Sequence, residues 1–343
     1  MRMRNVSLLV TLLTCALASN VLAQGDKALT AKLKHKKYKK WSIILPKETF
    51  TPANGTIKVA HAGGEGFVTE IDGTALAVDA NGDGKVDTKA KGSSGLITLK
   101  GKTAEGKSFK YTVRLRNEGG WQWSAGGAMV GTLGGESIKL IDQNNNGKYD
   151  DFGEDAMIIG KSDAAAFLSK VVSLKGSLYN LSVTADGKHL SATPWTGATG
   201  RLNIAKDYES KAKLITAVVE SGADGISFDL ARAKNGMLLP VGEYRIVSGM
   251  VAKGQQSARI KGGDRTYNVT ADSDVSVKWG GPIRAEFEYT VKGDQVTFSP
   301  NQVWYFGQAG EEYTNWMPGG MSPKFVLTRK KNARRIREAR FGS

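Results

Sequence analysis

Short stretches in which apolar and polar residues alternate run through most of the chain after residue 40. Ala75-Leu-Ala-Val78 and Ser137-Ile-Lys-Leu-Ile141 alternate or run apolar, and each lies between Gly and Asp residues. A period of two bounded by turn residues is typical of β-strands. The segment from Lys161 to Val172 differs. There Ser162 is a good N-cap for Asp163-Ala-Ala-Ala-Phe-Leu168, which predicts the one clear helix.

Beyond about Gly200 the alternation is denser, and strand-like segments recur at intervals of about 8–12 residues. The pattern predicts a mainly β fold. We expect two antiparallel β-sandwich-like domains, at residues 41–198 and 199–328, with calcium-loop hairpins and at most one or two short helices. The first strand is expected at Trp41–Leu45. Those of the second domain are expected at Leu214–Val219, Gly225–Leu230, Tyr244–Val247, Ser257–Ile260, Tyr267–Thr270, Val275–Trp279, Arg284–Val291, Gln295–Phe298 and Lys324–Thr328.

A weak internal repeat lies within residues 41–198. Leu99-Lys-Gly101 opens a stretch that ends near Trp121-Gln-Trp123, and Leu174-Lys-Gly176 opens another that ends near Trp195. Each stretch follows an acidic loop. We therefore expect two related β-units, each with a metal-binding turn and a hairpin, packed as one domain.

The acidic loops are Asp79-Ala-Asn-Gly-Asp-Gly-Lys-Val-Asp87 and Asp142-Gln-Asn-Asn-Asn-Gly-Lys-Tyr-Asp150. Calcium takes six to eight oxygen ligands at about 2.3–2.6 Å, which alternate side chains of a tight loop can supply. Gly at position 6 of each loop allows the positive φ of a sharp turn. The predicted ligands are Asp79, Asn81, Asp83, Asp87 and the carbonyl of Lys85 in the first loop, and Asp142, Asn144, Asn146, Asp150 and the carbonyl of Lys148 in the second.

The second loop carries one acid fewer at these positions. We expect weaker binding there unless Asp151, Glu154 or Asp155 adds a carboxylate, and Asp155 is counted among the candidate ligands. A plain hairpin turn is the alternative for both loops, because Asp-Gly and Asn-Gly form such turns without a metal. Four spaced oxygens with a Gly, found twice, favour calcium.

Both loops resemble the calcium loops of EF-hand-like and dockerin-like proteins over about a dozen residues each. An EF-hand has a bidentate Glu at position 12, where this chain has Ala90 and Gly153. The D-x-[DN]-x-[DN]-G-x-x-D loops that join strands in extracellular proteins are a better fit, and that resemblance implies that Asp87 and Asp150 complete the coordination. Separately, Leu239-Pro-Val-Gly-Glu-Tyr244 resembles the P-x-G-x-Y step of transthyretin-like and carboxypeptidase-regulatory-like sandwiches.

Residues 1–23 have the pattern of a secretory signal peptide. Two arginines precede an apolar run from Val6 to Ala18, and Val21-Leu-Ala23 is a small-residue site for cleavage after Ala23. We expect a secreted or periplasmic protein without a transmembrane helix, because no apolar run reaches about 18 residues. The one cysteine, Cys15, lies in this segment, so the processed chain would have no disulfide. Lipidation of Cys15 is the alternative.

The formal net charge of +15 lies in the ends of the chain. Residues 24–40 form a basic arm, expected to be mobile, and residues 329–343 form a basic tail, expected to be helical when bound. Such ends suit anionic cell-envelope polymers or lipid head groups, and solvated disordered ends are the alternative. Nucleic acid is disfavoured, because apart from Phe341 no aromatic residue is interleaved with the C-terminal cations.

The sequence has no recognisable catalytic set, since its three histidines lack zinc spacing and no phosphate-loop motif is present. Acidic and aromatic residues between Glu286 and Trp316 allow one alternative, because carboxylates flank the sugar in glycosidases. Trp304, Tyr313 and Trp316 would then bind the ligand, although core packing is the simpler role. We expect a secreted, calcium-binding, non-enzymatic structural or binding protein of the cell envelope or extracellular space. A carbohydrate-active enzyme or sugar-binding module is the alternative.

Overall fold

A computed structural model describes residues 27–59, 66–103, 105–222, 225–315 and 324–340. Within those ranges the backbone forms 32 β-strands and no α-helix. All but two of the described strand pairs are antiparallel. The mainly β fold predicted from the sequence is confirmed. None of the described ranges holds a helix long and apolar enough to cross a membrane, and the predicted signal segment lies outside them.

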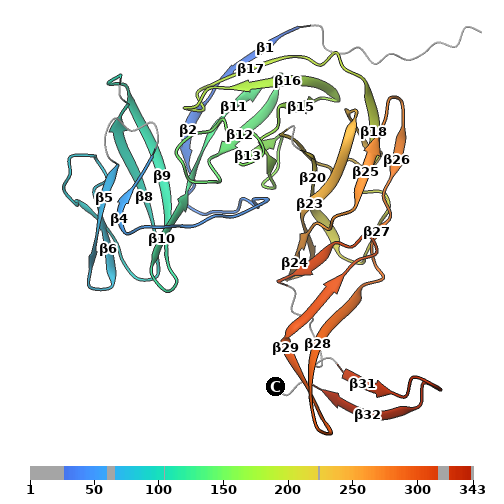
Figure 1. The fold of residues 1–343 in the computed structure, drawn as a ribbon. Helices are drawn as coiled ribbons and strands as arrows, with labels where there is room; N and C mark the ends of the chain where they lie inside the picture. The colour runs from blue at the N-terminus through green and yellow to red at the C-terminus, as the bar shows by residue number, and fades with distance from the viewer. Residues whose placement is uncertain (1–26, 60–65, 104, 223–224, 316–323, 341–343) are drawn as a thin grey trace, which may run out of the picture.

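Residues 51–125, here called the inserted unit, form two four-stranded sheets (Figure 1). The first acidic loop connects the fourth and fifth strands of this unit. One sheet contains, in spatial order, β3 (Thr51–Pro52), β10 (Trp121–Ala125), β9 (Ser108–Asn117) and β8 (Ser94–Lys102). The other contains β4 (Gly55–Ile57), β5 (Phe67–Asp72), β6 (Ala75–Val78) and β7 (Thr88–Ala90).

The flanking residues 29–37 and 127–194 form a second pair of sheets, here called the outer unit. The second acidic loop connects two neighbouring strands of one of these sheets. The first sheet contains β1 (Leu29–Lys32), β17 (His189–Pro194), β16 (Ser177–Val183) and β15 (Val171–Leu174). The second contains β2 (Lys34–Lys37), β11 (Gly127–Leu133), β12 (Glu136–Ile141), β13 (Ala156–Ile159) and β14 (Ala166–Phe167).

The two units share one strand plan. In each, the first strand pairs with the last and the second strand pairs with the third. The acidic loop joins the fourth strand to the fifth, β6 to β7 in the inserted unit and β12 to β13 in the outer unit. The repeat expected from the sequence is thus a repeat of topology. One copy is nested between β2 and β11 of the other.

Buried side chains from both units form one continuous core. Trp123, Tyr111 and Leu99 of the inserted unit are among its largest fully buried side chains, as are Leu140 and Ile141 of the outer unit. Burying apolar surface stabilises a fold by about 25 cal/mol per Å². The shared core therefore holds the inserted unit against the outer unit.

Residues 29–37 are not a mobile arm, and that expectation was wrong. β1 pairs with β17 and β2 with β11. Ala31 and Leu33 are only 9% and 4% exposed. The small and apolar residues between the lysines enter the core, whereas the lysines remain at the surface, so the run of charge concealed two edge strands.

The predicted helix at residues 161–172 is absent. Ser162 Oγ accepts the backbone N–H of Ala164 at 3.0 Å and caps only a turn. Ala164 then forms a parallel bridge with Ile44, and β14 and β15 follow. The strand predicted at Trp41–Leu45 is reduced to that bridge. Tertiary pairing has overridden the helix propensity of three consecutive alanines.

A second core is formed mainly by residues 199–314, around Trp279 and Tyr244, and it also includes Val171 and Leu178 from β15 and β16 of the outer unit. Each strand predicted between residues 214 and 298 overlaps an observed strand. The largest sheet runs β21 (Ile226–Asp229), β20 (Lys213–Ser221), β23 (Gly242–Lys253), β24 (Gln256–Lys261), β30 (Glu312–Thr314), β29 (Gln295–Phe306) and β28 (Arg284–Lys292), with β25 (Thr266–Val269) beside β23. Smaller sheets contain β22 (Met237–Pro240), β18 (Thr199–Asn203) and β26 (Asp274–Ser276), and β19 (Tyr208–Glu209) with β27 (Trp279–Gly280).

The C-terminal tail is part of a hairpin. β31 (Lys324–Thr328) pairs antiparallel with β32 (Arg335–Arg340). The strand predicted at Lys324–Thr328 is confirmed. The tail residues up to 340 form a turn and a strand in the chain without a partner, and the helix expected on binding stays a prediction.

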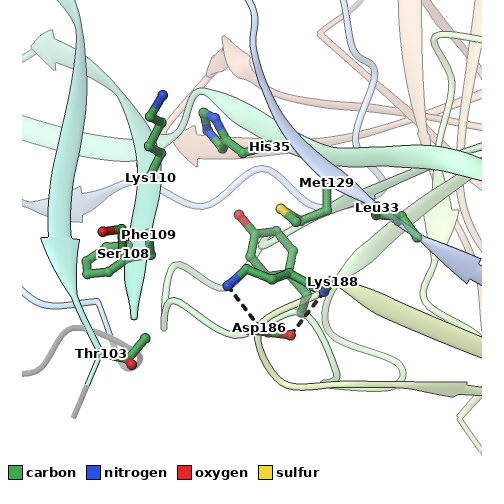
Figure 2. A pocket seen from close by; sticks show the side chains of 10 residues that line it. Leu33, His35, Thr103, Ser108, Phe109, Lys110, Met129, Asp186 and Lys188 are labelled. Carbon is green, nitrogen blue, oxygen red and sulfur yellow. Dashed lines mark hydrogen bonds and ion pairs between the residues drawn. The ribbon is translucent and has the colours of Figure 1, made fainter. Parts of the chain in front are cut away.

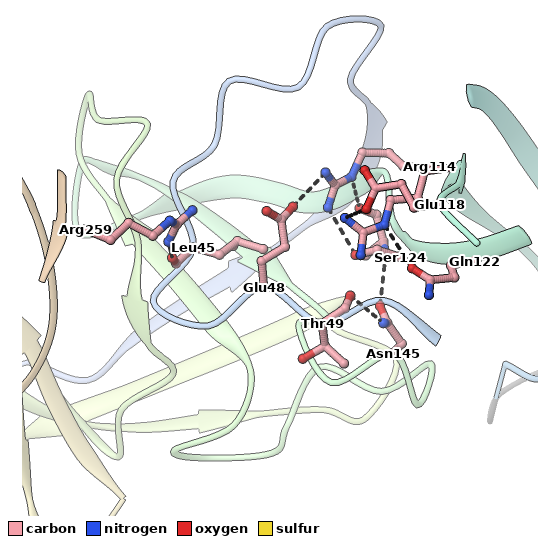
Figure 3. A network of polar contacts seen from close by, with 11 residues as sticks. Leu45, Glu48, Thr49, Arg114, Glu118, Gln122, Ser124, Asn145 and Arg259 are labelled. Carbon is pink, nitrogen blue, oxygen red and sulfur yellow. Dashed lines mark hydrogen bonds and ion pairs between the residues drawn. The ribbon is translucent and has the colours of Figure 1, made fainter. Parts of the chain in front are cut away.

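Residues 38–50, here called the connecting segment, link the outer unit to the inserted unit and also contact the second core. The Leu45 carbonyl accepts a hydrogen bond from Arg259 Nη1 at 3.2 Å (Figure 3). The neighbouring Pro46 carbonyl accepts one from Ser248 Oγ at 2.9 Å. The connecting segment therefore contacts the outer unit, the inserted unit and the second core.

Candidate metal centre

The first acidic loop winds around the Asp79 carboxylate, which is 1% exposed at the end of β6. Its Oδ1 accepts the backbone N–H of Asn81 at 3.2 Å and that of Gly82 at 2.7 Å. Its Oδ2 accepts the N–H of Gly84 at 2.8 Å. Gly82 and Gly84 have φ of 78° and 84°, a conformation that L side chains rarely adopt. The sharp turn predicted at Gly84 is confirmed.

The other predicted ligands of the first loop bond to its backbone. Asn81 Oδ1 accepts the N–H of Asp83 at 2.9 Å, and Asp83 Oδ1 accepts the N–H of Lys85 at 2.9 Å. Asp87 closes the loop, because its Oδ1 accepts the N–H of Ala80 at 3.0 Å. The side-chain oxygens at positions 1, 3, 5 and 9 therefore all accept hydrogen bonds from the backbone of the loop. The side chains after Asp79 remain largely exposed.

The second loop repeats this arrangement in a buried setting. Asp142 is fully buried, and its Oδ2 accepts the N–H of Gly147 at 2.6 Å. Its Oδ1 accepts the N–H of Asn146 at 3.2 Å. Asn145, with a φ of 63°, occupies the position that Gly82 has in the first loop. Asn adopts positive φ more readily than most residues, so the two loops have equivalent bends.

Two asparagines of the second loop contact one further acid. Asn144 Oδ1 accepts the N–H of Asn146 at 3.2 Å, and Asn146 Oδ1 accepts the N–H of Lys148 at 2.8 Å. The side-chain amides of both asparagines donate to Asp151 Oδ2, at 3.1 and 2.5 Å. Asp151, one of three acids that the sequence offered as an addition, therefore contacts the side chains at positions 3 and 5 of the loop.

Asp155 lies under the second loop and is 1% exposed. Its oxygens accept the N–H groups of Gln143 and Asp151, both at 3.2 Å. Burial raises the pKa of Asp142 to about 6, and burial together with the charge of Asp142 raises the pKa of Asp155 to about 9. Asp150 Oδ1 is buried without a hydrogen-bond partner. A bound cation would offset the repulsion between the Asp142 and Asp155 carboxylates, and it would give Asp150 Oδ1 a partner.

Tyr111, from β9 of the inserted unit, also reaches the second loop. Its hydroxyl donates to Asp142 Oδ2 at 2.6 Å, and its ring lies edge-on to Trp123 with the centroids 6.3 Å apart. Burial raises the pKa of Tyr111 well above its usual value, so the phenol stays protonated and acts as the donor. The first position of the second loop is therefore bonded directly to the other unit.

Asn145 joins the second loop to two other segments (Figure 3). Its Oδ1 accepts the N–H of Ala125 at 3.0 Å, and its Nδ2 donates to the Thr49 carbonyl at 2.9 Å. Close by, the Glu48 carboxylate pairs with Arg114 at 2.8 Å. The second loop thus lies where the outer unit, the inserted unit and the connecting segment meet.

Among the described residues, no three Asp, Glu, His or Cys side chains form a group that could hold a metal ion. A cation in either loop would therefore need amide and backbone carbonyl oxygens besides carboxylates, and calcium accepts all of these. The carbonyls of Lys85 and Lys148 stand at position 7 of their loops. The donor set of both loops is oxygen, and the unpaired Asp150 oxygen fits a hard cation.

A cavity of about 280 Å³ lies between the two units (Figure 2). Its walls come from the β8–β9 hairpin of the inserted unit and from β2, β11 and Tyr149 of the outer unit. Burial, and then the charge of Lys110, lowers the pKa of His35. His35 Nε2 lies 3.2 Å from the Thr112 hydroxyl. His35 and Thr112 therefore form a polar contact across the interface between the units.

The aromatic candidates do not form one described surface. Trp304 lies in β29, opposite the exposed Glu286 of β28. Tyr313 is 7% exposed in the second core, and its hydroxyl lies 3.2 Å from the Tyr208 hydroxyl. Trp316 lies outside the described residues. Tyr313 therefore serves core packing in this structure.

Comparisons with protein-family models, with curated proteins and with solved structures give no match. The site is therefore described by its geometry: two oxygen-rich loops that occupy equivalent places in two β-units of the same topology. Sequence reasoning located both loops but missed Tyr111 and Asn145. Asn145 had a signal, because Gly82 occupies the same position of the first loop. Tyr111 had none, since no local pattern relates it to Asp142.

Proposed function

We propose that this chain is a secreted calcium-binding protein of the cell envelope or extracellular space, with a structural or binding role and no catalytic one. One observation carries the proposal: the same oxygen-rich loop stands between the fourth and fifth strands of both units. Carboxylates held close together repel one another, and a divalent cation removes that repulsion. Bound calcium would fix each loop by electrostatic attraction and stabilise the shared core.

The ligands that we assign to calcium are those predicted from the sequence, together with Asp151. Extracellular calcium modules bind at about 10⁻⁴–10⁻³ M, which suits exposed loops with few acids. The second loop is the more buried of the two, and the first has one more acid at positions 1, 3, 5 and 9, whereas Asp151 and Asp155 add carboxylates to the second. The assigned groups are Asp79, Asn81, Asp83, Asp87 and the Lys85 carbonyl, and Asp142, Asn144, Asn146, Asp150, Asp151, Asp155 and the Lys148 carbonyl.

Thermal unfolding with and without calcium tests the proposal. At 10 mM calcium we expect a stabilisation of about 1–3 kcal/mol, seen as a rise of several degrees in Tm that EDTA reverses. Asp79→Ala together with Asp83→Ala should remove the contribution of the first loop. Asp264→Ala, an exposed acid outside both loops, is the matched control. An unchanged Tm in millimolar calcium would contradict the proposal.

A second candidate role is attachment to anionic cell-envelope polymers or lipid head groups through the β31–β32 hairpin. Residues 324–340 carry eight Lys or Arg against Glu338 alone. Val326, Leu327 and Ile336 are about half exposed on the same hairpin. Cations beside exposed apolar side chains favour an anionic surface.

Co-sedimentation with vesicles tests this second role. Deletion of residues 329–343 should abolish retention on anionic vesicles at low salt, whereas neutral vesicles should retain neither chain. If the full chain and the shortened chain are retained equally on anionic vesicles at the same salt, the tail is not the site of attachment.

A further inference from the structure

The outermost strand of the largest sheet, β28, is open to solvent. It is paired with β29 on one side, and on the other side no strand among the described residues pairs with it. All nine of its residues are exposed. Phe287, Tyr289 and Val291 are 43%, 58% and 59% exposed. A long edge strand without proline and with exposed apolar side chains is a template for pairing with another strand.

The irregularity in this hairpin does not protect the edge. Phe287 pairs with Val303 and Tyr289 with Phe298, so the extra residues lie in β29. β28 itself therefore runs without an inserted residue. Edge strands are commonly blocked by bulges or prolines of their own, and β28 has neither.

We propose that β28 is a homodimer interface, in which two copies of this chain pair their β28 strands antiparallel about a two-fold axis at Tyr289. The sheet would then continue from one copy into the other. A symmetric pairing of this kind uses the same surface on both copies and closes on itself. The proposal is independent of calcium binding.

The charges of β28 select this register. Antiparallel pairing about Tyr289 sets Glu286 against Lys292 of the second copy, and it brings Arg284 to the end where Asp294 lies in the turn after β28 of the second copy. Symmetry repeats the Glu286–Lys292 pair, so two directly opposed pairs of unlike charge form within the strands. In the single chain, Arg284 Nη2 forms an ion pair with Glu286 Oε1 at 2.7 Å, and both side chains are at least half exposed, so a second copy can reach them and exchange this contact for one between the copies. Directly opposed pairs of unlike charge stabilise antiparallel strands.

The neighbouring registers bring like charges together. A shift of one strand by a single residue would set its apolar side chains against the polar side chains of the other strand. Among the registers that keep the faces, the centre at Glu288 opposes Arg284 to Lys292, and the centre at Phe287 opposes Glu286 to Glu288, so both bring like charges together, which destabilises pairing. The centre at Thr290 opposes Glu288 to Lys292, but it carries Glu286 toward the acid Asp294 and leaves Phe287 opposite Gly293 of the turn, so the aromatic side chain loses its apolar partner.

The apolar face agrees with the same register. Tyr289 meets its own copy, and Phe287 meets Val291 of the second copy, so the three exposed side chains cover one another. A membrane is a poorer occupant for this strand, because residues 284–294 contain two cations and three acids and have no net attraction to anionic lipid. A second copy satisfies both the apolar and the charged groups.

Sedimentation velocity of the full chain over a concentration series tests the proposal, and we expect a monomer–dimer equilibrium. Glu286→Lys or Lys292→Glu alone should weaken dimerisation roughly tenfold or more. The double variant should restore it, because the charges are only exchanged. Glu288→Lys is the matched control, since Glu288 faces the neutral Thr290. A chain that stays monomeric, or a double variant that remains as weak as the single ones, would overturn the proposal.

Cysteine cross-linking gives a second readout that does not depend on affinity. Directly opposed residues have Cα atoms about 4.5–5.5 Å apart, within the range of a disulfide. With Cys15 replaced by Ser, Tyr289→Cys should form a covalent dimer under mild oxidation. Glu288→Cys should not, because its symmetry mate lies two positions along the strand. Equal cross-linking of both variants, or none at Tyr289, would refute the register.

Discussion

The Tyr111–Asp142 hydrogen bond is a short, buried link between the inserted unit and the second acidic loop, which belongs to the outer unit. Both groups are almost fully buried, and the bond measures 2.6 Å. The same Asp142 oxygen also accepts the N–H of Gly147. Removing the phenol would therefore leave a buried carboxylate with one fewer donor, which is costly in a low-dielectric site.

We expect Tyr111→Phe to lower the free energy of unfolding by about 1–3 kcal/mol, because the buried Asp142 carboxylate loses its hydroxyl donor while the ring packing is kept. Urea denaturation measures this change. Tyr289→Phe, which removes a hydroxyl from a side chain that is 58% exposed, should leave the free energy of the monomer unchanged. Equal stabilities of the Tyr111 variant and the parent chain would show that the bond contributes nothing.

At the scale of elements, β1 and β2 give the basic N-terminal segment a structural role. Each is the edge strand of a different sheet of the outer unit. Leu33, between them, is 4% exposed and belongs to the shared core. The segment therefore contributes backbone pairing and apolar burial, and its lysines are not its main link to the fold.

Deletion of residues 24–37 should cost at least about 3 kcal/mol, because two edge strands and their buried side chains are lost. Thermal unfolding measures the effect. A matched control replaces Lys32, Lys34, Lys36 and Lys37 by Gln, which removes the charge and keeps the strands, and it should change the Tm little. A Tm that falls as far for the control as for the deletion would mean that charge, not pairing, holds this segment.

Local pattern predicted the strands of the second core well, because alternation and Gly-containing turns are encoded within a few residues. The first domain was harder. The lysines of residues 29–37 masked the apolar positions of β1 and β2, whose partners lie more than 80 residues away in the chain. The alanines after Ser162 favoured a helix that pairing with Ile44 prevents. The acidic loops were found because their spacing is local, whereas Tyr111 was not.

At the scale of the whole molecule, the described residues contain two cores, and Val171 and Leu178 of the outer unit pack in the second one. Hydrogen bonds through Leu45 and Pro46 link them, as does the bond from the Ser227 N–H to Ser169 Oγ. Both acidic loops belong to the first core. A ligand of those loops should therefore stabilise one core more than the other.

Scanning calorimetry should resolve two transitions, and calcium should move only one of them, because a ligand shifts the unfolding of the unit that binds it. Asp142→Asn should reduce that shift without moving the second transition. Trp279, buried in the second core, offers a fluorescence probe for the assignment. A single transition, or equal movement of both by calcium, would show that the cores unfold as one.

The nesting of one unit within the other also sets an order for biosynthesis. A chain made from its N-terminus presents Leu29 early, but the partner of Leu29 is Ala192, which is synthesised only after the whole inserted unit. Until then the backbone N–H and C=O groups of β1 lack their partner strand and its apolar side chains are exposed. Segments with these two features tend to aggregate. The surrounding lysines act as gatekeepers that keep such a segment soluble. We therefore expect the positive charge of residues 24–40 to keep the nascent chain soluble until the partner strand of β1 has been synthesised.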